Sequence, residues 1–127
     1  MDWKIELIAV PVTDIDRARD FYANLGWNVD HDQTVSEEIR FVQITPPGSA
    51  CSIAFGKGVS EMEPGSMNAI QLVVPDADAA LALLTERGVA AQGVQELGWG
   101  RFVFFKDPDG NSYALQELPD WSKQRQS

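Results

Sequence analysis

Apolar side chains recur at helical spacing in two segments of the chain, and each segment follows a short apolar strand pattern. An aspartate, Asp14 or Asp76, stands where the N-cap of each helix is expected. A glycine, Gly26 or Gly88, stands where each helix should end. We therefore predict two amphipathic helices whose buried stripes are Ile15, Ala18, Tyr22 and Leu25 in the first, and Ala77, Ala80, Leu81 and Leu84 in the second.

The two patterns are copies of one unit. Residues 8–27 align with residues 70–89 at a constant offset of 62 (70 − 8), which is nearly half of the 127 residues. Strand, acidic cap, helix and glycine stop all recur in the same order, which indicates an internal repeat.

Three strand patterns follow each helix, so each copy is predicted to fold as βαβββ. Gly and Pro residues separate them, most clearly in the turn at residues 107–111, with sequence Asp-Pro-Asp-Gly-Asn. The predicted strands are 28–33, 39–45 and 51–55 in the first copy, and 91–96, 101–106 and 112–118 in the second.

These boundaries predict a single α+β domain over residues 1–127. The first βαβββ module covers 4–56, a linker covers 57–68, and the second module covers 69–118. The polar residues 119–127 are expected to form a tail.

Composition narrows the class of protein. Nineteen acidic and ten basic side chains give a formal net charge of −9, which disfavours nucleic acid and anionic membrane surfaces as partners. The start of the sequence lacks the pattern of a secretion signal, and Cys51 is the single cysteine, which favours a cytoplasmic location.

Paired βαβββ units, the segment VPVTDIDRARDFYANLGW and the segment FFKDPDGNSYALQEL resemble the vicinal oxygen chelate superfamily, which includes glyoxalase I, bleomycin-resistance proteins and extradiol dioxygenases. The resemblance implies two cup-shaped mixed sheets with helices packed outside. It also implies a homodimer in which a second chain completes each cup.

Metal-dependent members of that superfamily carry His, Glu or Gln ligands at positions that the resemblance places at Leu7, Ala69, Ala114 and either Ser52 or Ala54. These side chains are poor ligands for a divalent metal. The single histidine, His31, is interpreted as a solvated side chain, so no metal and no cofactor are predicted.

The remaining residues favour binding over catalysis, without deciding it. No serine or cysteine nucleophile has an evident base, because His31 is the one histidine, and Cys51 is interpreted as a small filler. Two other functions stay open: a metal-free isomerase or lyase that uses Arg40, Arg101 or Tyr113, and an interaction module whose cup is filled by its own side chains.

Strand alternation and the resemblance together predict an apolar, aromatic cup with a few amides. Trp99, between Gly98 and Gly100, is expected either to fold over a flat ligand or to pack in the interior. The preferred hypothesis is that the protein binds and sequesters a bulky, partly aromatic natural product, as bleomycin-resistance proteins do. The predicted ligand-binding residues are Leu7, Phe41, Gln43, Phe55, Gln71, Trp99, Phe102, Phe104, Ala114 and Gln116.

Overall fold

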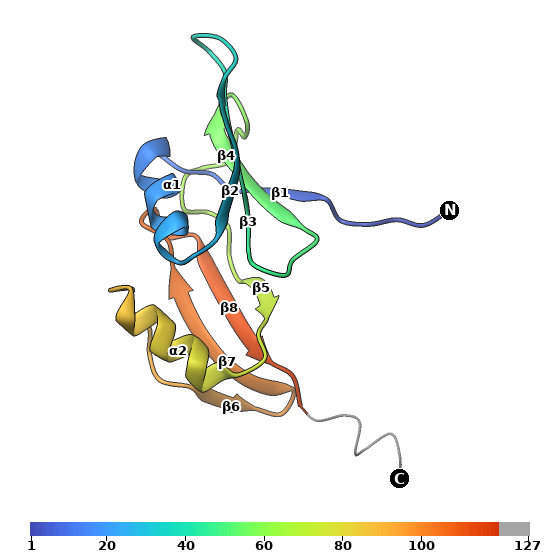
Figure 1. Ribbon diagram of the computed structural model, residues 1–127, viewed down its shortest axis with the longest axis vertical. Helices are drawn as coiled ribbons and strands as arrows, with labels where there is room; N and C mark the ends of the chain where they lie inside the picture. The colour runs from blue at the N-terminus through green and yellow to red at the C-terminus, as the bar shows by residue number, and fades with distance from the viewer. Residues whose placement is uncertain (120–127) are drawn as a thin grey trace. The chain divides into compact units, whose positions relative to one another are not determined.

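A computed structural model describes residues 1–119 of the chain. It contains two helices and eight strands, in two four-stranded sheets of mixed direction (Figure 1). The chain divides into two compact units, one of residues 1–67 with 107–111, the other of residues 68–106 with the segment from 112 onward. Neither helix in residues 1–119 is long and apolar enough to cross a membrane.

The first unit holds one βαβββ copy. Its sheet has the order β1-β4-β3-β2, with β1 parallel to β4 and the other pairs antiparallel. Helix α1 packs against β2, β3 and β4. The elements are β1 (Leu7–Ala9), α1 (Ile15–Asn24), β2 (Asn28–Thr34), β3 (Arg40–Thr45) and β4 (Ser52–Lys57).

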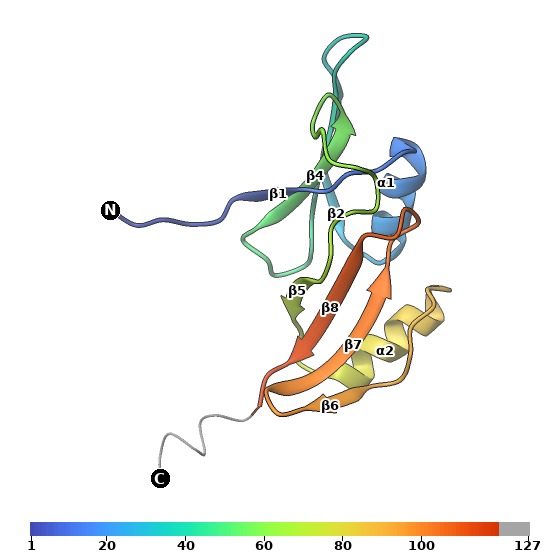
Figure 2. The ribbon, with the colours of Figure 1, turned by 180° about the vertical axis from the view of Figure 1, so that it is seen from behind.

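The second unit repeats this arrangement with the sheet order β5-β8-β7-β6. Strand β5 runs parallel to β8, and helix α2 packs on β7 and β8 (Figure 2). The elements are β5 (Ile70–Val73), α2 (Ala77–Glu86), β6 (Gln95–Leu97), β7 (Gly100–Lys106) and β8 (Ser112–Glu117).

The predicted α+β fold with two βαβββ modules is confirmed. The Asp14 carboxylate caps α1 by accepting a hydrogen bond from the N–H of Arg17 at 3.0 Å. Asp76 caps α2 in the same way through the N–H of Ala79, at 3.1 Å. The strand predicted at 91–96 is shorter and later than expected, because only Gln95–Leu97 pair with β7. Of the predicted tail, residues 120–127 lie outside the described part of the chain.

Each helix covers one face of its sheet. In the first unit the covered face carries Val42, Ile44 and Phe55, which are fully buried. Phe55 lies 5.8 Å from Tyr22 of α1, measured between ring centroids. The prediction that Phe55 lines the cup is therefore wrong in its choice of face: the residue belongs to the core under α1, while its neighbours Ser52 and Ala54 alternate onto the other face.

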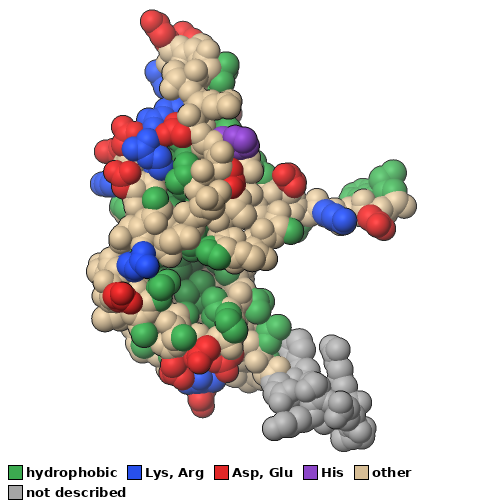
Figure 3. All heavy atoms as spheres, in the orientation of Figure 1, with side chains coloured by type: hydrophobic (Ala, Val, Ile, Leu, Met, Phe, Trp, Pro, Cys, Tyr) green, Lys and Arg blue, Asp and Glu red, His purple; other side chains and the backbone are tan. Residues whose placement is uncertain are grey.

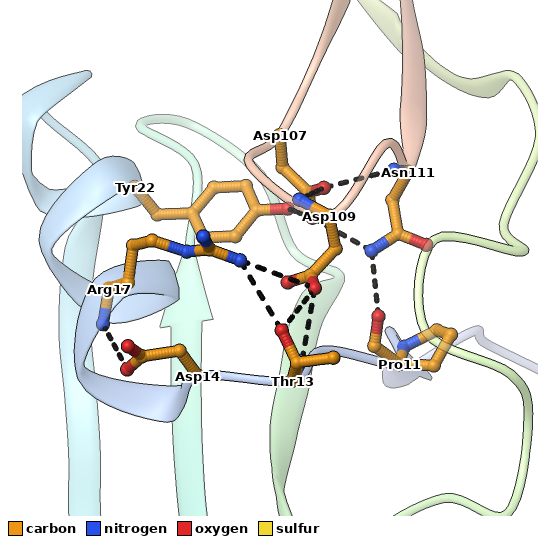
Figure 4. A network of polar contacts seen from close by, with 8 residues as sticks. All are labelled: Pro11, Thr13, Asp14, Arg17, Tyr22, Asp107, Asp109 and Asn111. Carbon is orange, nitrogen blue, oxygen red and sulfur yellow. Dashed lines mark hydrogen bonds and ion pairs between the residues drawn. The ribbon is translucent and has the colours of Figure 1, made fainter.

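The turn at residues 107–111 is part of the first unit, although the strands on either side of it belong to the second. Asp107 is buried and accepts four hydrogen bonds (Figure 4). Its Oδ1 accepts from the backbone N–H groups of Asp109 at 3.0 Å and Asn111 at 2.9 Å. Its Oδ2 accepts from the Tyr22 hydroxyl at 2.7 Å and from Asn111 Nδ2 at 2.8 Å.

Asn111 and Asp109 extend the same network. Asn111 Nδ2 also donates to the Pro11 carbonyl at 2.8 Å, and Asn111 Oδ1 accepts from the N–H of Met67 at 3.1 Å. Asp109 Oδ1 accepts from both the N–H of Thr13 at 3.1 Å and its hydroxyl at 2.6 Å. The polar residues of this turn therefore do more than shape a hairpin. They also hold the segment before α1 in place.

Candidate functional site

The sheet of the second unit has one face that α2 covers and one that it leaves free. Register places Phe102 opposite Gln116 and Phe104 opposite Ala114, so these four side chains share a face. Arg101 and Glu117 lie on the other face, since Arg101 pairs with Asp78 of α2 and Glu117 Oε1 accepts from the first N–H of α2. We call the face with Phe102 and Phe104 the aromatic face.

Three rings form a row on and beside this face. The Phe102 and Phe104 rings lie 5.8 Å apart with an interplanar angle of 8°, and Trp99 meets Phe102 edge-on at 6.3 Å. Phe102 is buried in the middle of the row, whereas Trp99 is 60% exposed and Phe104 39% exposed. Trp99 lies in the two-residue turn between β6 and β7, so its backbone is held by a tight hairpin.

Two amides lie beside the rings. Gln71 Nε2 donates to Gln116 Oε1, and Gln116 Nε2 donates to the backbone carbonyl of Trp99 at 2.7 Å. Gly100 makes this arrangement possible: a Cβ at that position would lie 3.2 Å from Gln116 Nε2 and 2.7 Å from the Glu117 carbonyl oxygen. The Gln116 side chain is therefore fixed between β5 and the Trp99 turn.

The second unit brings together six of the ten predicted ligand-binding residues. They share the aromatic face or border it, and none of them carries an ionisable side chain. They are Gln71, Trp99, Phe102, Phe104, Ala114 and Gln116.

Three further predicted residues lie on the helix-free face of the first sheet. Phe41 and Gln43 alternate with Val42, which faces α1, and Leu7 aligns with Ser52 on β4. Gln43 Nε2 donates to Ser52 Oγ at 3.3 Å. Thr45 lies within 2.7 Å of Ser52, measured between the two hydroxyl oxygens, so Gln43, Ser52 and Thr45 form one hydrogen-bonded group. Strand periodicity alone did not indicate Ser52 and Thr45 as site residues.

Leu7, Ala69 and Ala114, which stand where the resemblance implies the metal ligands of the superfamily, have side chains without donor atoms for a metal. Within residues 1–119, no group of three His, Cys, Asp or Glu side chains is arranged to hold a metal ion. His31 lies on β2 and is exposed, and Figure 3 shows its purple side chain at the surface.

The residues considered for metal-free catalysis lie away from both helix-free faces. Arg40 pairs with Asp16 and Asp32 at 2.9 Å each. This pairing lowers the pKa of Asp32 to about 2 through hydrogen bonds from Arg40 and Arg19. Tyr113 is buried and stacks on Phe105 on the face that α2 covers. The geometry thus gives no support to a catalytic role for these side chains.

The chain is similar to known proteins over most of its length, and this similarity shows its family. The sequence pattern of the Glyoxalase/Bleomycin resistance protein/Dioxygenase superfamily matches residues 4–115, and the chain belongs to this superfamily.

Individual relatives refine the comparison. TnmS3, an antibiotic binding protein from Streptomyces sp. CB03234, is 36% identical and superposes with a TM-score of 0.84, covering 93% of this chain and 98% of its own. A glyoxalase/bleomycin resistance protein from the same strain is 37% identical, with a TM-score of 0.79 and coverage of 90% and 100%. The uncharacterized protein YetH of Bacillus subtilis is 27% identical over 90% of this chain and 98% of its own.

Proposed function

We propose that the protein binds and sequesters a bulky, partly aromatic natural product without altering it. The row of Trp99, Phe102 and Phe104 beside the Gln71 and Gln116 amides is the observation that carries this proposal. The 36% identity to TnmS3, an antibiotic binding protein, supports it. A role in resistance to an antibiotic follows from this function, since a sequestered compound is withheld from its target.

The chemistry of the aromatic face suits a flat ring system. Exposed rings at Trp99 and Phe104 can stack on a ligand, and each such contact contributes about 1 kcal/mol beyond the burial of apolar area. The amides of Gln71 and Gln116 each retain hydrogen-bonding capacity beyond these bonds, and this capacity can orient polar edges of the ligand. These side chains do not titrate near neutral pH, so the face favours binding over proton transfer.

Replacing Trp99 with alanine is expected to weaken binding of a planar quinone about tenfold, because about 1.4 kcal/mol of stacking and contact is lost. Isothermal titration calorimetry with 1,4-dihydroxyanthraquinone as the probe measures this effect. Trp27→Phe is the matched control, since Trp27 stacks on Tyr22 at 5.3 Å in the first unit and its loss should leave the affinity unchanged.

The same titration separates the competing functions. Recovery of the quinone unchanged after binding agrees with sequestration, whereas conversion over many turnovers per chain would establish the isomerase or lyase alternative. Equal affinity of wild type and Trp99→Ala would remove Trp99 from the site. A chain that binds no member of a panel of planar aromatic natural products would fit the interaction module instead.

We also propose a homodimer in the cytoplasm. Each four-stranded sheet ends in open edges, β1 and β2 in the first unit and β5 and β6 in the second, and a two-fold partner can cover such edges. Light scattering at micromolar concentration should therefore give about twice the 14.0 kDa chain mass. A mass of one chain under these conditions would contradict the dimer.

A further inference from the structure

The aromatic face carries a charged side chain, Lys106, at the end of β7 that lies away from Trp99. Alternation along β7 places Lys106 on the same side as Phe102 and Phe104, and register places it opposite Ser112. Each strand residue advances the chain by about 3.3 Å, so the Lys106 backbone lies about 7 Å beyond that of Phe104. Lys106 and Trp99 therefore mark opposite ends of the aromatic row, and both belong to the second unit.

The other ionisable side chains of this sheet lie on the face that α2 covers. They are Glu96, Arg101, Tyr113 and Glu117. Arg101 pairs there with Glu96 at 3.3 Å and with Glu117 at 3.4 Å. Among the residues of β5 to β8, Lys106 is thus the one that brings a charge to the aromatic face, and no carboxylate of these strands shares that face with it.

The ammonium group of Lys106 is available to a ligand. The residue is exposed, and it forms no hydrogen bond or ion pair with another residue of the described segment 1–119. Arg101 of the same strand, by contrast, pairs with three carboxylates. An ammonium has three N–H donors and no acceptor, so Lys106 offers a positive charge and three donors beside the exposed ring of Phe104.

We propose that Lys106 binds an anionic oxygen of the ligand, such as a carboxylate, while Trp99 and Phe104 stack on its rings. This inference rests on the proposed function and names the chemical class of the ligand as a planar aromatic acid. A ring system stacked on Phe104 carries its edge substituent toward Lys106, whose flexible four-carbon stem can adjust to it. Gln71, which lies across Ala114 from Phe104, remains for a neutral polar group.

The preference for an acid must come from this local contact, because the net charge of −9 repels anions. Salt screens that repulsion beyond about 8–10 Å, whereas an oxygen bonded to Lys106 lies well inside this distance. An ion pair at a partly exposed site contributes up to about 1 kcal/mol, which corresponds to about fivefold in affinity.

Two anthraquinones of nearly the same shape test this selectivity. Anthraquinone-2-carboxylate is an anion at neutral pH, and anthraquinone-2-carboxamide is neutral. Calorimetry at low salt should show that the wild-type chain binds the carboxylate about fivefold more tightly than the carboxamide. In Lys106→Gln the ratio should fall to about one or below, while the carboxamide keeps its affinity within about twofold.

Arg87→Gln is the matched control. It removes the same charge from an exposed position of the second unit, at the C-terminal end of α2 and so on the other side of the sheet, and should keep the fivefold ratio. A wild-type ratio of one, a preference that persists in Lys106→Gln, or an equal fall in both variants would overturn the role of Lys106 while the sequestration function stands. Failure of the wild-type chain to bind either probe at millimolar concentration would count against the proposed function itself.

Discussion

Replacing Asp107 with alanine is expected to lower the free energy of unfolding by about 3–5 kcal/mol, because several buried donors lose their shared acceptor and each unsatisfied donor costs about 1–3 kcal/mol. The buried carboxylate accepts hydrogen bonds from Tyr22, Asp109 and Asn111, and its removal leaves those donors without their acceptor. Urea denaturation, followed by tryptophan fluorescence, measures the change.

Two further variants calibrate this result. Tyr22→Phe removes one of the four donors and should cost about 1.5–3 kcal/mol, the usual value of a hydrogen bond to a charged group. Asp20→Ala removes an exposed carboxylate from α1 and should change stability by less than about 0.5 kcal/mol. If Asp107→Ala unfolds at the same urea concentration as Asp20→Ala, the network does not hold the turn.

Gly100→Ala is expected to lower stability by about 3 kcal/mol and to weaken binding of the quinone probe. The backbone of Gly100 has φ +148°, which costs an L side chain about 1–3 kcal/mol. The added Cβ would also meet the Glu117 carbonyl oxygen at 2.7 Å, and such overpacking adds about 1–3 kcal/mol. Gln116 must move as well, which disturbs its bond to the Trp99 carbonyl.

Gly98→Ala is the matched control on the other side of Trp99. A Cβ at Gly98 would meet no atom within 4 Å, and Gly98 has no positive φ, so the fold and the affinity should remain near wild type. Urea denaturation and quinone titration of both variants give the comparison. Equal behaviour of the two alanine variants would show that Gln116 is not fixed by the Gly100 backbone.

Local signals predicted the helices well because each cap acts within a few residues. Asp14 bonds the N–H three residues later, and Gly26 adopts φ +90°, so both ends of α1 follow from short-range chemistry. The aromatic face could also be predicted from the sequence, since β7 and β8 are regular and alternation alone puts Phe102, Phe104 and Gln116 on one side.

Other features depend on contacts that alternation does not encode. Phe55 looked suitable for the cup, but the register of β4 turns it toward Tyr22. A β-bulge between Val29 and His31 in β2 changes the face of every later residue in that strand, and nothing in the run Asp30 to Asp32 marks which residue is the extra one. The partner of Asp107 on α1, Tyr22, lies 85 residues before it, so no local sequence pattern predicts this contact.

The hydrogen bond from Asn111 to the Pro11 carbonyl has a consequence for the order of folding. Its two residues are 100 positions apart, so the segment before α1 emerges from the ribosome long before its partner is synthesised. Closing so long a loop slows folding, because the entropic cost is met before the contact is made. Completion of the first unit therefore waits for synthesis of the turn at residues 107–111.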